Sequence, residues 1–128
     1  MDALEIEITS ALREKLEYFM QLHDFYGVLL TDRQNTCFTM HYIEDLSLAE
    51  IGEVLGITPQ AVADQLKRTV SILRRYDEKM ELIKNWQKQK GQLKQLSDAL
   101  TKLIAEGYPL DEIKVMLDNI LAGDSPLE

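Results

Sequence analysis

Cys37 and His41 are the residues whose types and spacing first suggest chemistry. They stand four positions apart, so a helix would place the thiol and the imidazole on one face, as a pair of metal ligands requires. A structural zinc site needs four ligands, however, and the sequence offers no convincing partners for these two. The second histidine, His23, falls on an apolar stripe. We therefore expect no metal site and interpret these side chains as packing or surface residues.

Catalytic patterns of other kinds are missing from the sequence. It contains no Gly-x-x-x-x-Gly-Lys phosphate loop, and no serine stands beside a histidine with a third residue to orient it. The acidic residues are spread along predicted solvated helix faces. We therefore expect a binding protein that has no enzymatic activity, no catalytic residues and no cofactor.

Nucleic-acid binding is the chemistry that the stretch from Thr58 to Tyr76 favours. It carries four basic residues against one acidic residue, a net charge of +3. Glutamines near the start of such a helix could pair with adenine, whereas lysine and arginine further along are better placed for phosphates. The alternative is that these are solvated residues on a helix that mainly packs. The predicted DNA-binding residues are Thr58, Gln60, Ala61, Asp64, Gln65, Lys67 and Arg68.

The charge of the whole chain argues against a generally basic nucleic-acid binder. Its 128 residues include 22 acidic and 14 basic residues, a net charge of −8. The acid is concentrated toward both ends, whereas residues 84–102 carry a net charge of +4. Any contact with nucleic acid must therefore be local and sensitive to salt. A second basic stretch, suited to RNA or an acidic partner, comprises Arg74, Arg75, Lys84, Lys88, Lys90 and Lys94.

Capping signals predict the helices that position these residues. Thr31 and Ser47 each begin a capping box, and Thr58 followed by proline is a further helix start. Gly56 ends the helix that Ser47 begins, and small Gly52 lets that helix approach the next one. Two helices joined by a short glycine turn are typical of the helix-turn-helix motif.

The remaining chain is predicted to flank this motif with further helices. Residues 1–8 alternate apolar and acidic side chains, and we interpret them as a flexible tail before a helix that begins at Thr9 or Ser10. Residues 9–90 would form the helix-turn-helix domain, with its last helix running to about Lys90 before Gly91 interrupts. Residues 91–128 would form a C-terminal helical hairpin that ends in a frayed tail from Ala122. Its leucine stripes pack on each other or on a second copy, and both arrangements stay open.

The compartment follows from what the sequence lacks. No apolar run approaches the roughly 20 residues of a membrane span, and the N-terminus has no basic secretory signal. A single cysteine fits a reducing compartment. We expect an all-α, cytoplasmic protein.

Three motifs in order resemble the YlxM family of small bacterial helix-turn-helix proteins. They are Leu30 to Gln34, Asp45 to Gly52 and Gln60 to Thr69. The resemblance implies a bundle similar to region 4 of sigma factors, followed by a C-terminal helical extension. This chain departs from the family pattern at Gln60 and Ala63, where the family often has a basic and an aromatic residue.

The resemblance also implies two functions, because the family's gene commonly lies beside that of the signal recognition particle GTPase. One is a regulatory protein that binds duplex DNA and takes part in that particle's pathway. The other is an interaction module that does not bind DNA but contacts the GTPase or the RNA of the particle. A homodimer is compatible with both.

Overall fold

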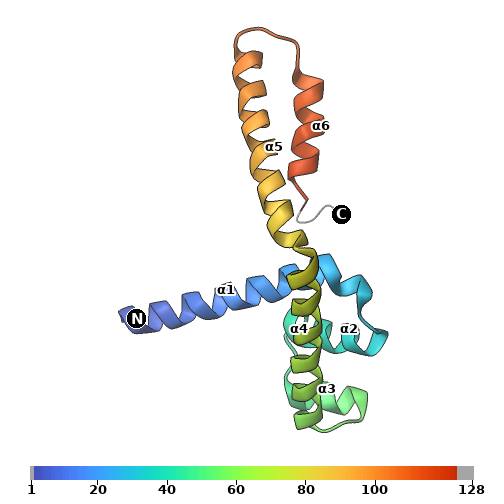
Figure 1. Ribbon diagram of the computed structural model, residues 1–128. Helices are drawn as coiled ribbons and strands as arrows, with labels where there is room; N and C mark the ends of the chain where they lie inside the picture. Colours follow the sequence, from blue (N-terminus) through green and yellow to red (C-terminus); the bar gives the residue numbers. More distant parts are fainter. Residues whose placement is uncertain (1, 124–128) are drawn as a thin grey trace. The chain divides into compact units, whose positions relative to one another are not determined.

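The computed structural model describes residues 2–123, and every regular element in that range is helical, so the fold is all-α as predicted. The α-helices are α1 (Ala3–Tyr26), α2 (Asp32–Phe38), α3 (Leu48–Leu55), α4 (Pro59–Met80), α5 (Leu82–Ala105) and α6 (Asp111–Leu121) (Figure 1). A 3-10 turn, Gly27–Leu29, follows α1, and a π-helical turn, Thr39–Ile43, continues α2. The chain divides into two compact units, Met1–Met80 and Glu81–Glu128. The described part contains no helix that is both long and apolar enough to span a membrane.

The first unit is organised around α4, which packs against α1, α2 and α3. Its buried side is apolar except for Thr69, whose hydroxyl donates to the Gln65 carbonyl oxygen at 2.8 Å. One core cluster, which joins α2, α3 and α4, consists of Cys37, Met40, Ile51, Val62 and Leu66. Because this side of α4 is held in the core, its opposite side is left to solvent.

The helix-turn-helix is formed by α3 and α4, at the positions that the sequence predicted. Ser47 Oγ accepts a hydrogen bond from the Glu50 backbone N–H at 3.1 Å, and Gly56 ends α3 with a positive φ of 70°. A Cβ atom on Gly52 would lie 2.6 Å from the Ile57 carbonyl oxygen. The close approach of α3 to the turn therefore requires glycine at this position.

The start of α1 differs from the sequence prediction of a flexible tail. The helix begins at Ala3 rather than at Thr9 or Ser10. Asp2 and Glu5 form a capping box, in which the Asp2 carboxylate accepts from the Glu5 N–H at 2.8 Å and Glu5 accepts from the Asp2 N–H at 3.2 Å. The alternation of residues 4–8 suggested a strand period, but a cap that satisfies two backbone donors favours the helix.

The boundary between the units also differs from the prediction. The structure breaks the helix at Glu81, which has a positive φ of 51°, whereas Gly91 lies inside α5. A single glycine costs a helix only about 1 kcal/mol relative to alanine, and the residues on either side of Gly91 are good helix formers. The boundary between the two compact units therefore lies at Glu81, ten residues before Gly91 in the sequence.

The second unit is a hairpin of α5 and α6, which pack on each other. Gly107, with a φ of 102°, and the proline two residues later separate the two helices as predicted. Leu100 and Leu117 are buried between them, and the Ser97 hydroxyl donates to Asp118 at 2.9 Å. The frayed tail predicted from Ala122 lies outside the described residues from position 124 onward.

Candidate nucleic-acid interface

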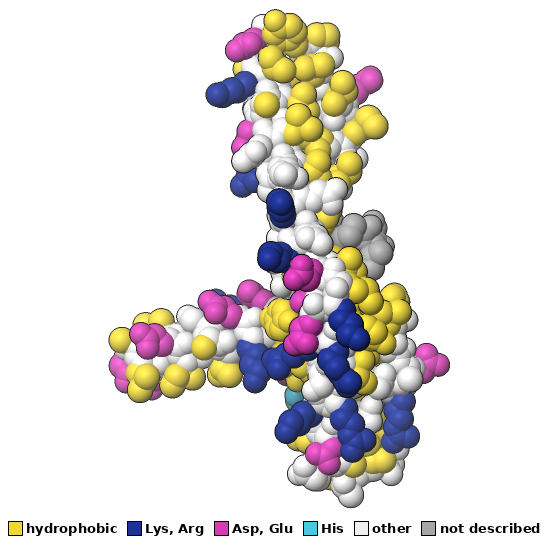
Figure 2. All heavy atoms as spheres, viewed as in Figure 1, with side chains coloured by type: hydrophobic (Ala, Val, Ile, Leu, Met, Phe, Trp, Pro, Cys, Tyr) yellow, Lys and Arg dark blue, Asp and Glu magenta, His cyan; other side chains and the backbone are white. Residues whose placement is uncertain are grey.

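The exposed side of α4 carries most of the basic side chains of the first unit. Val62, Leu66 and Leu73 hold the other side of the helix in the core. Figure 2 shows Lys and Arg side chains gathered over this helix. The exposed residues that make up the basic face of α4 are Lys67, Arg68, Arg74, Arg75 and Lys79.

The residues predicted to read bases lie at the start of α4 and are already engaged within the chain. The Thr58 hydroxyl accepts the Ala61 N–H at 3.1 Å, so it caps the helix. Gln60 Nε2 donates to Asp64 Oδ1 at 3.2 Å. Ala61 and Gln65 are half-buried. This arrangement offers few unoccupied donors to base edges, whereas Lys67 and Arg68, one turn further along, are exposed.

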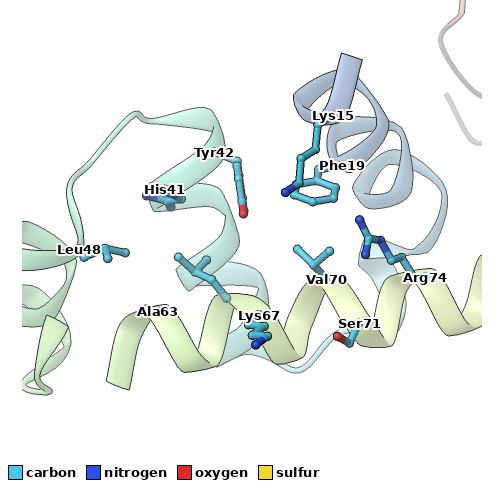
Figure 3. A pocket seen from close by; sticks show the side chains of 11 residues that line it. Lys15, Phe19, His41, Tyr42, Leu48, Ala63, Lys67, Val70, Ser71 and Arg74 are labelled. Atoms are coloured by element: carbon cyan, nitrogen blue, oxygen red, sulfur yellow. The ribbon is translucent and has the colours of Figure 1, made fainter. Parts of the chain in front are cut away.

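A groove of about 480 Å³ borders one flank of the basic face of α4 (Figure 3). Its apolar lining includes Phe19, whose ring lies 5.6 Å from that of Tyr42. The Lys15 ammonium and the Arg74 guanidinium lie 5.7 Å and 5.3 Å from the Phe19 ring centre, within range of cation–π attraction. The full lining is Lys15, Phe19, His41, Tyr42, Leu48, Ala63, Leu66, Lys67, Val70, Ser71 and Arg74.

This groove contributes one positively charged side chain, Lys15, that sequence reasoning did not assign. No carboxylate is among its lining residues, although the chain as a whole is acidic. Burial raises the pKa of the Tyr42 hydroxyl, and the positive charge of Arg74 opposes that rise. The i, i+4 spacing of Lys15 and Phe19 was the available signal in the sequence, because it places a cation next to an aromatic ring on one helix face.

Cys37 and His41 do not form a pair of metal ligands. Cys37 is fully buried in the core, and its burial raises the pKa of the thiol. His41 Nδ1 lies 2.9 Å from the Leu46 carbonyl oxygen. His23 stacks on Phe38 at 4.7 Å between ring centres, which makes it a packing residue. Among residues 2–123, no group of three or more His, Cys, Asp or Glu side chains is placed to hold a metal ion.

The second basic stretch is divided between the two units. Arg74 and Arg75 belong to α4, whereas its four lysines belong to α5. Lys90 is half-buried, and its Nζ donates to the Gly123 carbonyl oxygen at 3.2 Å. The exposed lysines of this stretch on α5 are Lys84, Lys88 and Lys94.

Comparison with known proteins places this architecture in a family. Residues 13–113 match the family described as "Putative helix-turn-helix protein, YlxM / p13 like". The UPF0122 protein of Caldanaerobacter subterraneus subsp. tengcongensis is 43% identical over 79 residues, which cover 62% of this chain and 68% of that protein. The UPF0122 protein of Thermoanaerobacter sp. (strain X514) is 40% identical over 99 residues, which cover 77% and 84%.

A third relative extends the match over most of its own length. The UPF0122 protein of Geobacillus sp. (strain WCH70) is 37% identical over 102 residues, which cover 79% of this chain and 93% of that protein. The matched region includes the whole helix-turn-helix and the basic face of α4. The chain therefore belongs to the family of YlxM/p13-like helix-turn-helix proteins.

Proposed function

We propose that this chain is a cytoplasmic regulatory protein that binds duplex DNA through the basic face of α4 and has no enzymatic activity. The observation that carries the proposal is the concentration of exposed positive charge on the second helix of a helix-turn-helix, in a chain of net charge −8. In this motif the second helix enters the major groove. Acidic surface elsewhere on the protein would repel DNA, so the protein would approach DNA with the basic face of α4.

Contacts to phosphates dominate this binding mode. Four exposed cations would contact the phosphate backbone of DNA, which carries no information on base sequence. They are Lys67, Arg68, Arg74 and Arg75. Gln60 must release Asp64 before its amide can pair with a base, and the Asp64 carboxylate is itself repelled by phosphate. We therefore expect modest affinity, weak sequence preference and strong dependence on salt.

A second candidate function follows from the exposed lysines of α5. Lys84, Lys88 and Lys94 form a basic series in the second unit, separate from the helix-turn-helix. Such a series could contact RNA or an acidic protein surface. The resemblance to the YlxM family suggests the RNA or the GTPase of the signal recognition particle as that partner.

Two double variants that remove the same charge distinguish the candidates. Lys67→Ala/Arg68→Ala removes two cations from α4, and Lys84→Ala/Lys88→Ala removes two from α5. Fluorescence anisotropy with labelled duplexes of several sequences should show the α4 variant about ten- to a hundredfold weaker on all of them, since it loses two charge-assisted phosphate contacts. The α5 variant should bind duplex as the unmodified chain does.

The same variants tested on the signal recognition particle complete the comparison. The second candidate is correct if the α5 variant recovers less of the particle than the unmodified chain does, and if the unmodified chain binds no duplex at low salt. In that case the DNA proposal fails. If both variants bind duplex equally well, the basic face of α4 is not the DNA contact.

A further inference from the structure

The α5–α6 hairpin has more large apolar side chains that are exposed than apolar side chains that are buried. Its buried apolar side chains are Ile83, Trp86, Leu100 and Leu117. Its exposed large apolar side chains are Leu82, Leu96, Leu103, Tyr108, Ile113, Val115, Met116 and Ile120. Two helices bury one seam between them, and a patch of this kind on a small unit usually marks an interface.

Most of these exposed side chains fall on one face of the hairpin. Ile113, Met116 and Ile120 have i, i+3, i+7 spacing, so they form one stripe along α6, and Leu96 and Leu103 are two turns apart on α5. Each stripe lies beside the buried seam of its own helix. Because the helices are antiparallel, both stripes turn to the same side of the hairpin, where Figure 2 shows hydrophobic side chains gathered. We call these five residues the apolar face of the hairpin.

The charges of the two helices indicate what covers this face. Helix α5 has five lysines against Asp98, a net charge of +4, whereas α6 has a net charge of −2. Two copies can pack face to face around a two-fold axis that runs parallel to the helices. This arrangement places the basic α5 of each copy beside the acidic α6 of the other. A two-fold axis perpendicular to the helices would instead place the two basic α5 helices side by side, where they would repel each other. One copy of this hairpin is therefore complementary to another in both apolar surface and charge.

We infer that the apolar face of the hairpin binds the same face of a second copy of this chain, forming an antiparallel four-helix bundle. All neighbouring helices are antiparallel in this arrangement, as in simple bundles with short loops. The five apolar side chains of each copy become the centre of the bundle. Both chains enter it from the same end, at Leu82.

Adjacent residues of α6 provide a matched test by sedimentation equilibrium of the full chain. Met116 is 68% exposed and belongs to the apolar face, whereas Val115 is 59% exposed and points away from that face. The unmodified chain should have twice the 14.7 kDa mass of one copy. Met116→Glu should weaken the dimer about tenfold or more, because two buried apolar groups become charges, and Val115→Glu should leave it intact.

Circular dichroism checks that both variants are folded. Both substitutions are at exposed helical positions, so the helix content should not change. A monomeric unmodified chain overturns the inference. Equal effects of the two substitutions overturn it as well. Exposed apolar residues of α1 provide a further check, because a dimer lost in Ile8→Glu/Leu12→Glu but kept in Met116→Glu would place the interface on α1 instead.

Cross-linking tests the orientation of the two copies. The hydrogen bond between Ser97 and Asp118 shows which residues of α5 and α6 lie at the same height along the hairpin. Six residues closer to the turn on each helix, Leu103 lies at the height of Glu112 and Ile113. Mixed Leu103→Cys and Ile113→Cys chains should therefore form an intermolecular disulfide, whereas Leu103→Cys alone should not. The native thiol of Cys37 is buried and does not compete. Cross-linking of Leu103→Cys with itself would contradict the proposed arrangement.

Discussion

Replacing Gly52 by alanine tests the packing of the helix-turn-helix. The added Cβ atom would lie 2.6 Å from the Ile57 carbonyl oxygen and 3.5 Å from the Pro59 nitrogen. The first atom belongs to the backbone of the turn, which the Ile57 N–H ties to the Gly52 carbonyl oxygen at 3.0 Å. A side-chain rotation cannot relieve this clash, so α3 and the turn must separate.

Two opposing terms set the magnitude. Alanine is favoured over glycine inside a helix by about 1 kcal/mol. Overpacking a tight contact costs about 1–3 kcal/mol, and the upper part of that range applies because the contacted atom is backbone. We therefore expect Gly52→Ala to lower the free energy of unfolding of the first unit by about 1–2 kcal/mol.

Gly91→Ala is the matched control for this substitution. Gly91 lies inside α5, and beyond the neighbouring backbone of its own helix nothing stands within 4 Å of the Cβ that alanine would add. The same change of residue should here stabilise the second unit by about 0.5–1 kcal/mol, from helix propensity alone.

Urea unfolding with two signals separates the units. Far-ultraviolet circular dichroism follows both units, whereas the fluorescence of Trp86, the one tryptophan of the chain, reports on the second unit, to which this residue belongs. Gly52→Ala should shift the dichroism transition to lower urea and leave the fluorescence transition in place. Gly91→Ala should raise the fluorescence transition. A Gly52→Ala chain as stable as the unmodified one would refute the packing argument.

Three further predictions concern groups whose proton affinity the fold alters. Burial, together with the charge and hydrogen bond of Asp77, raises the pKa of Tyr18, so this tyrosine stabilises the fold below its unfolded pKa and that stability is lost as pH rises through the folded value. Asp77→Asn should lower the Tyr18 pKa in an ultraviolet titration, and an unchanged pKa would contradict the assignment. Hydrogen bonds from Lys114 and Ser97 lower the pKa of Asp118, so the second unit should lose stability as pH falls below the ordinary aspartate range; fluorescence-detected unfolding at several pH values checks this, and a pH-independent midpoint would refute it. Burial raises the pKa of the Cys37 thiol, so a thiol reagent should label it only as fast as the chain opens, and immediate labelling in native buffer would show that the thiol is accessible.

The sequence was sufficient where a structural feature is local. The capping box of Thr31 with Gln34 is present, with hydrogen bonds of 3.0 Å and 3.3 Å, as are the Thr58 cap and the left-handed turn at Gly56. A cap or turn depends on residues within four positions of each other, so its pattern is legible without knowledge of the tertiary fold.

Features that depend on distant contacts or marginal energies were not legible. No glycine or proline at Glu81 indicates its left-handed backbone conformation, and the sequence pattern predicted the helix break at Gly91 instead. The groove beside α4 joins Lys15 and Phe19 of α1 to Tyr42 and Arg74, which lie far apart in the sequence. The hydrogen bond of Gln60 to Asp64, which occupies a predicted base-reading side chain, could equally have been a solvent contact.

The salt dependence of duplex binding tests the central proposal, that the basic face of α4 binds DNA through phosphates, most directly. The slope of the logarithm of affinity against the logarithm of salt concentration falls by about 0.9 for each phosphate contact removed. Lys67→Ala/Arg68→Ala should therefore reduce the magnitude of the slope by about 1.8, while Lys84→Ala/Lys88→Ala should leave it unchanged. An unchanged slope in the first variant, or an equal reduction in both, would contradict the proposal.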